Sequence, residues 1–412
     1  MVANPSSSGH VSRCSLGLHS RMNQTELQAA VSATADGGTL TLPAGIHTID
    51  ASVGTVTFTR SITIDGGGSI IACTPAPGNG MPMLNGDTPN GSIVTLKNFT
   101  LAGPTITYDP TNGSETKAND SWIGIRVGRT GCPTTRVTLR NVNITGLFGS
   151  GFMRVGGGYT SVIGCIINAW ETPVAIFAGH PSDVSGFCRL ICNKISGVGS
   201  KFSSVGVYIH PNMSLVSVGN VFEDFNYHGL SAHGGPEPVA GQHWYSGHDR
   251  FNRCPMIHSP RVPVPVTVDN AICSGPPARA SVIKGNLAMT DSTLVNQSLT
   301  YFPDYDHTVT IVDTTWAPTA VCGGAQGSGS WLYRNVEWQL GGVGSTPSVE
   351  PDVVGTVTYE DCDAYDVGST SPYLIKCAGN AVIDATELRI HTSRNDAVLS
   401  TATNLTGPTI IR

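Results

Sequence analysis

VIGCII (residues 162–167) begins a pattern that recurs as LICNKI (190–195), SVGNVF (217–222) and SGHDRF (246–251). The alignment places four residues at one position, at spacings of 28, 27 and 29 residues: Cys165, Asn193, Asn220 and Asp249. Each stretch is short, apolar and bounded by Gly, Asn or Asp, which is typical of a β-strand. Weaker versions extend from LRNVNI (139–144) to VTYEDCDA near the C-terminus. The chain is therefore expected to repeat one structural unit.

A repeat of about two dozen residues that holds several short strands and no helix predicts a parallel β-solenoid, in which each coil stacks on the next. A polar residue repeated at one bend fits this arrangement, because stacked amides hydrogen-bond along the column and satisfy the backbone of the turns. We therefore expect the column from Cys165 to Asp249 to be structural.

The composition narrows the class of protein. The 412 residues carry a formal net charge of −6, with 13% charged and 40% hydrophobic residues, which leaves material for a buried core. A weak negative charge without blocks argues against nucleic acid as a partner. There is no apolar run of about 18 residues, and the N-terminus lacks the order of a signal peptide. The eleven cysteines include no CxxC pair and no zinc-ligand spacing, so we expect buried, reduced thiols.

One helix is expected, at TELQAAVSA (25–33), with Thr25 as its cap and Leu27, Ala30 and Val31 on one face. A turn and two strands follow in ADGGTLTLPAGIHTI (35–49). This opening resembles the start of the pectate-lyase-like right-handed parallel β-helix superfamily, in which a helix covers the open end of the solenoid. The later coils match that pattern through essentially the whole chain. The superfamily includes pectin-active lyases and hydrolases, uronate epimerases, and the tailspikes and other virion proteins of bacteriophages.

The resemblance implies an all-β fold, a right-handed single-stranded parallel β-helix with a short N-terminal capping helix. Residues 1–24 are expected to form an N-terminal arm, and residues 25–412 a single β-helix domain with an irregular C-terminal end. A cap is needed because an open coil exposes its core and its strand edges. NLTGPTIIR (404–412) is apolar and has no obvious cap, which suggests burial against another chain or a partner.

Histidines recur where strands end. VGVYIHP (205–211) aligns with HGLSAHG (228–234), so their alternate apolar residues are expected to point inward and His210 to lie beside His233. Two further histidines reach the same position if a one-residue bulge is allowed: His180 and His258. Because coils stack about 4.8 Å apart, the four would form a column on the outer face. The column could be half-exposed residues that hydrogen-bond to turns, a site for a saccharide or an anion, or a metal site.

Aromatic and acidic residues lie between the bend strand and the histidine-bearing strand of neighbouring coils. Aromatic faces beside carboxylates are what sugar binding uses, and two close carboxylates could act as acid and base on a glycosidic bond. If the chain is an enzyme, we expect Glu171 and Asp224 to be its catalytic pair. The expected substrate-binding residues are Trp170, Tyr208, His210, Tyr227, His228, His233, His180 and His258.

Other chemistry receives less support. In the pectate-lyase branch the resemblance implies a calcium cluster of aspartates with an arginine base, and the neighbouring coils carry no group of three or four acids. The Asp-Pro-His-Asp motif of the epimerase branch is absent. No cofactor and no metal site is expected. A second candidate patch is the inserted loop YFPDYDH (301–307), and one of Trp331 and Trp338 is expected to pack inside the solenoid.

The sequence favours a virion-associated, tailspike-type β-helix that binds, and could degrade by hydrolysis or elimination, a bacterial surface polysaccharide. The resemblance implies a homotrimer that is assembled in the host cytoplasm and acts outside the cell. Its expected partners are the polysaccharide and other virion proteins, with no nucleic acid and no membrane. Two alternatives stay open: a non-catalytic structural virion protein, such as a capsid decoration or tail component, and a cellular polysaccharide lyase or hydrolase.

Overall fold

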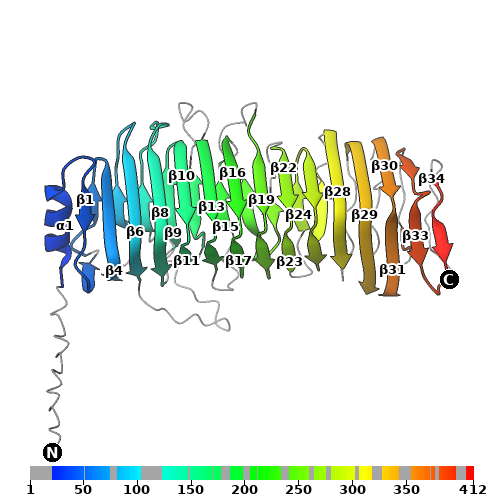
Figure 1. Cartoon of the computed structure of the whole chain (residues 1–412), viewed down its shortest axis with the longest axis horizontal. Coiled ribbons are helices and arrows are strands. Elements are labelled where there is room, and N and C mark those ends of the chain that lie inside the picture. Colours follow the sequence, from blue (N-terminus) through cyan, green and yellow to red (C-terminus); the bar gives the residue numbers. More distant parts are fainter. Residues whose placement is uncertain are drawn as a thin grey trace, which may run out of the picture.

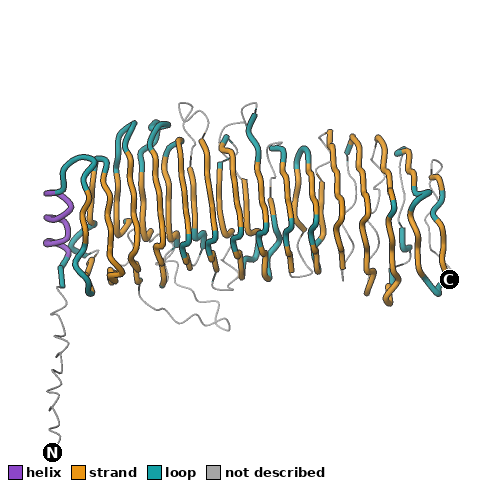
Figure 2. The backbone as a smooth tube through the Cα atoms, in the orientation of Figure 1, coloured by secondary structure: helices purple, strands orange, loops and turns teal. Residues whose placement is uncertain are grey.

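The computed structural model describes residues 21–50, 52–74, 81–103, 123–146, 149–169, 171–177, 186–197, 205–210, 212–232, 241–258, 264–274, 280–301, 306–317, 327–342, 354–371, 373–375, 380–395 and 405–412. The chain forms an elongated stack of coils, with the helix α1 (Gln24–Ala33) at one end and the last strands at the other (Figure 1). Strands cross the long axis side by side along the whole stack (Figure 2). The predicted all-β parallel β-helix with a short N-terminal helix is confirmed.

The described strands form two sheets. The smaller sheet has ten strands: β3 (Val56–Phe58), β5 (Pro82–Gly86), β7 (Ile123–Val127), β9 (Ser150–Val155), β12 (Val174–Phe177), β15 (Val205–Ile209), β18 (His228–Ala232), β21 (Ile257–His258), β24 (Ala280–Ile283) and β27 (Ser298–Tyr301). Its strands pair in parallel, coil upon coil.

The larger sheet has 25 strands and consists of two parallel ladders that meet at a bend in each coil. Its strands are β1 (Thr39–Thr41), β2 (Ile46–Asp50), β4 (Ile62–Thr74), β6 (Ile93–Ala102), β8 (Arg136–Thr145), β10 (Gly158–Ile163), β11 (Ile166–Asn168), β13 (Gly186–Ile191), β14 (Lys194–Ser196), β16 (Met213–Val218), β17 (Val221–Glu223), β19 (Trp244–Gly247), β20 (Arg250–Asn252), β22 (Val266–Asp269), β23 (Ile272–Ser274), β25 (Leu287–Thr290), β26 (Thr293–Val295), β28 (Asp306–Ala317), β29 (Ser328–Gly342), β30 (Val354–Glu360), β31 (Cys362–Ser369), β32 (Val382–Asp384), β33 (Leu388–His391), β34 (Leu405–Thr406) and β35 (Thr409–Ile411). Some strands, such as β8, run through the bend, whereas in other coils the bend separates two strands.

A single residue in the left-handed region makes this bend. In β8 the buried side chains are Val137 and Leu139 before it and Val142 and Ile144 after it, so the alternation gains one residue. The extra residue is Asn141, with φ +51°. Asn, Asp and Gly adopt this conformation more readily than other residues, which explains their recurrence in the sequence. The equivalent residues have φ between +48° and +66°: Asn98, Gly164, Cys192, Gly219, His248, Asn270, Asp291, Asp313, Asn335 and Asp361.

The polar column just after the bend is structural, as predicted. The Asn193 side-chain oxygen accepts from the Cys165 N–H at 2.9 Å, and the Asn193 amide donates to Asn220 Oδ1 at 2.9 Å. The Asn220 amide donates in turn to Asp249 Oδ1 at 3.1 Å. Burial raises the pKa of Asp249, while hydrogen bonds from neighbouring hydroxyl and amide groups oppose that shift. The ladder therefore ties successive coils together through groups that water does not reach.

The interior of the coils is a continuous apolar core. In β15 and β18, Val207 pairs with Leu230 and Ile209 with Ala232, and all four are buried, which confirms the predicted alignment and inward direction. The expectation for Trp331 and Trp338 was wrong, because both are buried. Seven residues separate them, which in a uniform strand would put them on opposite faces. The left-handed residue between them, Asn335, restores the inward direction.

The helix α1 covers the first coils with Leu27 and Val31, which are 2% and 1% exposed, whereas Ala30 is only partly buried. Its N-cap is Asn23, so the expectation of Thr25 was wrong. Asn23 Oδ1 accepts from the Glu26 N–H at 3.0 Å, and Glu26 Oε2 accepts from the Asn23 N–H at 2.8 Å, which makes a reciprocal cap. Thr25 lies two residues later, already inside the helix. In the part of the chain that the structure describes, no helix is long and apolar enough to cross a membrane.

Candidate functional site

The predicted histidine face is more buried than expected. The His210 side chain is only 8% exposed and stands edge-on to Phe177 and Tyr208, with ring centroids 5.4 Å and 5.7 Å away. Its neighbour on the preceding coil is Phe177, because Ile209 pairs with Ile176. His180 and His233 lie outside the described residues. These contacts form an aromatic cluster on the outer side of the smaller sheet.

The remaining predicted binding residues differ in how exposed their side chains are. Tyr227 is 43% exposed, whereas His228 is 4% exposed and pairs through its backbone with Val205. The backbone of His258 pairs with Ser231, two residues before His233, so the one-residue bulge expected for His258 was wrong. The side chain of His258 and all of Trp170 lie outside the described residues. Among the members of this set that the structure describes, Tyr227 is therefore the most exposed.

The two predicted catalytic carboxylates lie in non-equivalent places. Asp224 follows β17 and accepts two hydrogen bonds from the Arg253 guanidinium, the longer at 2.8 Å. Glu171 is exposed and follows β11, two coils earlier. Equivalent positions two coils apart are separated by about 10 Å. This backbone separation is close to the carboxylate spacing of an inverting glycosidase, up to about 9.5 Å, and larger than the roughly 5 Å of a retaining one.

The second patch predicted from the sequence is closed where the structure describes it. Tyr301 and His307 are each 1% exposed, and His307 Nδ1 bonds the Gly285 carbonyl oxygen at 2.9 Å. Their rings also contact buried Trp331. Residues 302–305 lie outside the described residues. Tyr301 and His307 thus contribute to the core rather than to an open loop surface.

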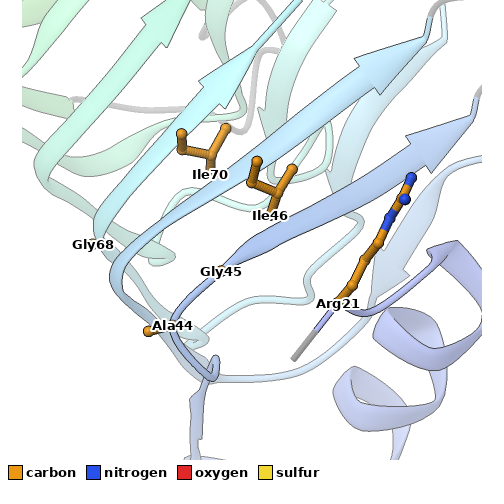
Figure 3. A pocket seen from close by; sticks show the side chains of 6 residues that line it. All are labelled: Arg21, Ala44, Gly45, Ile46, Gly68 and Ile70. Atoms are coloured by element: carbon orange, nitrogen blue, oxygen red, sulfur yellow. The ribbon is translucent and has the colours of Figure 1, made fainter. Parts of the chain in front are cut away.

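A hollow of about 640 Å³ lies at the N-terminal end of the larger sheet, on the side where Ile46 and Ile70 project (Figure 3). These two side chains are 53% and 39% exposed and pair in register. Arg21 forms one wall of the hollow. The hollow lies at β2 and β4, several coils before the predicted site residues, and none of those residues lines it. Its lining residues are Arg21, Ala44, Gly45, Ile46, Gly68 and Ile70.

An aromatic pair stands on the outer face of the larger sheet. Tyr159 of β10 and Phe187 of β13 pair in register, and their rings are stacked with centroids 5.6 Å apart and planes 14° apart. Both are half-buried, because alternate residues of these strands fill the core and leave the rings outside. Two parallel rings on adjacent coils present a flat apolar surface about as wide as two strands, which is what a sugar ring stacks on.

Three arginines lie on the same face as this aromatic pair: Arg136, Arg140 and Arg189. Arg136 pairs in register with Tyr159, and Arg189 lies two residues beyond Phe187 on β13. All three are exposed. Among the described residues, none of the three guanidinium groups has a hydrogen-bond or ion-pair partner. We call Tyr159, Phe187 and the three arginines the aromatic–arginine face.

The C-terminal coils carry a second charged cluster on the outer face of the larger sheet. Asp363 accepts from Arg389 at 2.6 Å and 2.9 Å and from His391 Nε2 at 2.7 Å. Arg389 also reaches Asp361 at 2.8 Å, and the Tyr365 ring stacks on His391 at 4.4 Å. The Arg389 guanidinium holds the pKa of Asp363 below its ordinary value. Within this cluster the basic and acidic side chains therefore pair with one another.

Across the described ranges, no three His, Cys, Asp or Glu side chains are grouped as a metal site requires.

The sequence prediction missed the aromatic–arginine face, although a signal for part of it was present. Tyr159 and Phe187 are 28 residues apart, the same interval that separates Cys165 from Asn193, so the repeat alignment already placed the two rings side by side. The sequence did not show that the arginines lack partners. Their partners would come from residues 20 to 30 positions away on adjacent coils, and the register alone identifies those residues.

No protein-family model matches the chain, and no curated protein is similar to it. Solved structures share the architecture at low identity. The catalytic unit of an α-1,3-glucanase from Streptomyces thermodiastaticus is 13% identical with a TM-score of 0.42, over 94% of this chain and 66% of that one. The Geobacillus virus E2 protein ORF18 is 11% identical with a TM-score of 0.36, over 90% and 61%. The Dettilon tailspike protein is 13% identical with a TM-score of 0.34, over 88% and 68%. The chain therefore spans about two thirds or less of the length of the first two.

Proposed function

We propose that this chain is a virion-associated β-helix of tailspike type that binds a bacterial surface polysaccharide. The observation that carries the proposal is the stacked pair of Tyr159 and Phe187, with centroids 5.6 Å apart, on the outer face of a rigid parallel sheet. The two half-buried rings leave an apolar surface open on this face, and a saccharide ring has a matching apolar face. The virion setting and a homotrimeric assembly rest on the resemblance that the opening helix and the coils carry.

Binding is tested with purified protein and a panel of capsular and lipopolysaccharide preparations, with affinity measured by calorimetry. Replacing both rings, Tyr159→Ala with Phe187→Ala, should weaken binding about tenfold or more, because the stacking surface is lost. Tyr365→Ala is the matched control, since Tyr365 also stacks on a ring of an adjacent coil but lies in the self-paired C-terminal cluster. Binding to no preparation in the panel, or an equal loss in the control, contradicts the proposal.

Cleavage of the polysaccharide is a separate step of the proposal, assigned to Glu171 and Asp224. The double variant Glu171→Gln with Asp224→Asn should abolish any release of reducing ends while binding persists. Arg253→Ala is informative beside it, because Arg253 holds Asp224 through two hydrogen bonds. If the wild-type chain binds a preparation and releases nothing from it, the chain is a binding protein, and its assembly can then be measured by light scattering.

A further inference from the structure

The aromatic–arginine face gathers three exposed arginines that have no ion-pair partner among the described residues. Residues 123–197 hold seven basic and two acidic residues, in a chain whose net charge is −6. Four of the seven are engaged: Arg126 with Asn85, Arg129 with Asp87, Lys194 with Glu223, and Arg154 with backbone carbonyls in the core. The remaining three are Arg136, Arg140 and Arg189, and all of them lie on the same face of the larger sheet as the stacked rings.

The register makes this arrangement unfavourable for the isolated chain. Arg140 pairs with Lys97 on the preceding coil and with Ile163 on the next. Lys97 is satisfied by Asp65 at 3.1 Å, so no carboxylate remains for Arg140. Like charges directly opposite each other in a sheet are destabilising. Stability therefore gives no reason for a guanidinium at this place.

We propose that the aromatic–arginine face binds the acidic sugar residues of the polysaccharide, with the carboxylates of uronic acids taken by Arg136, Arg140 and Arg189. This rests on the proposed function and adds the charge class of the ligand. The planar guanidinium forms two parallel hydrogen bonds with a carboxylate, which suits Arg better than Lys at such a site. The rings of Tyr159 and Phe187 provide an apolar contact at one edge of this group, in line with Arg136.

The spacing of the arginines favours a polymer over a small anion. Arg136 and Arg140 are four residues apart on β8, and Arg189 lies two coils further on, so neighbouring backbone positions are separated by about 12 to 13 Å. Each guanidinium can then engage a different carboxylate along an extended chain. Nucleic acid also presents repeated anionic groups, but the chain as a whole repels it through its net charge of −6.

The test uses the full chain and three uronate polymers as probes: polygalacturonate, alginate and hyaluronate. Each is compared with its carboxyl-esterified, neutral form, and a DNA duplex serves as a non-saccharide polyanion. We expect at least one uronate polymer to bind at least about tenfold more tightly than its neutral form. Its affinity should fall as salt rises from about 50 mM to about 500 mM, because exposed charges are screened.

The decisive variant is Arg136→Ala with Arg140→Ala and Arg189→Ala, three exposed changes whose folding is checked by circular dichroism. It should remove the preference for the acidic form, whereas Arg334→Ala should keep it. Arg334 is the matched control because it occupies the register position of Arg140 and is neutralised by Glu360 at 2.6 Å. Equal binding of acidic and neutral forms, or equal loss in the control, overturns the inference and leaves the proposed function standing. Tighter binding of DNA overturns it as well. If no polysaccharide in either panel binds, the proposed function fails with it.

Discussion

Arg140 and Arg334 occupy the same position in coils far apart along the solenoid, but their surroundings differ. On the next coil Arg140 faces Ile163, whereas Arg334 faces Glu360 and bonds it at 2.6 Å. The contrast extends to whole regions, because residues 123–197 hold seven basic and two acidic residues and residues 327–395 hold four basic and nine acidic ones. One fold thus supports a face that neutralises itself and a face that leaves its charges available.

The difference shows what a charged residue does on a β-solenoid. A column position fixes only the direction of a side chain, and the residue one coil away decides whether the charge is satisfied. In the C-terminal coils, Arg389 and His391 both converge on Asp363. The ion pairs of Arg389 and His391 therefore stabilise the fold, whereas the unpaired arginines near Tyr159 and Phe187 contribute little to its stability.

The largest effect is expected from breaking the self-paired face. Asp363→Ala should lower the free energy of unfolding by about 1–2 kcal/mol, because Arg389 and His391 lose their shared acceptor in a partly solvated setting. The measurement is urea denaturation. Arg189→Ala should leave stability within about 0.5 kcal/mol, as an exposed residue without partners does.

Asp361→Ala is the closer control for that experiment. It removes a carboxylate from the same guanidinium, at 2.8 Å, but the Asp361 side chain is 68% exposed against 23% for Asp363. Its effect should be smaller than that of Asp363→Ala. Equal losses for the two variants would mean that burial and the contact with His391 add nothing to the pairing.

The self-paired and the open face could not be told apart from the sequence, although the fold could be predicted. The coil positions of Asn193, Asn220 and Asp249 follow from a local repeat, and the structure confirms both their alignment and their hydrogen bonds. The left-handed bend residue was not foreseen. Missing it led to the error at Trp331 and Trp338, because one extra residue reverses the alternation of inward and outward side chains.

The catalytic pair stays a prediction, because the sequence alone does not show which side chains lie one coil apart. The sequence prediction paired Glu171 with Asp224 because of their residue types and their similar place in the repeat. The register places them two coils apart, and Asp224 accepts hydrogen bonds from Arg253. Partners on a solenoid come from one coil away, and the loops between strands vary in length. Spacing along the chain alone therefore does not identify the partner of a charged side chain.

An intermediate effect is expected when the open face is converted into a self-paired one. Ile163→Glu places a carboxylate beside Arg140, as Glu360 stands beside Arg334. The new ion pair should stabilise the fold by no more than about 1 kcal/mol and weaken uronate binding roughly threefold, because one of three guanidinium groups is neutralised. Ile163→Gln, which removes the same apolar side chain without adding charge, is the control. Equal binding by the Glu and Gln variants would show that Arg140 takes no part.

The smallest effect concerns the pH dependence of the two faces. The hydrogen bonds from Arg389 hold the pKa of Asp363 below its ordinary value of 3.8, against partial burial, with His391 acting in the same direction as Arg389. A carboxylate whose pKa is lowered in the folded state contributes stability above its unfolded pKa and loses it as the pH falls through the folded pKa. The stability difference between wild type and Asp363→Ala should therefore be present at about pH 5 and should shrink below about pH 4. Urea midpoints measure this difference, and Arg189→Ala should show none at any pH. A difference that persists unchanged at about pH 2.5 would mean that the Asp363 side chain stabilises the C-terminal coils through packing rather than through its charge.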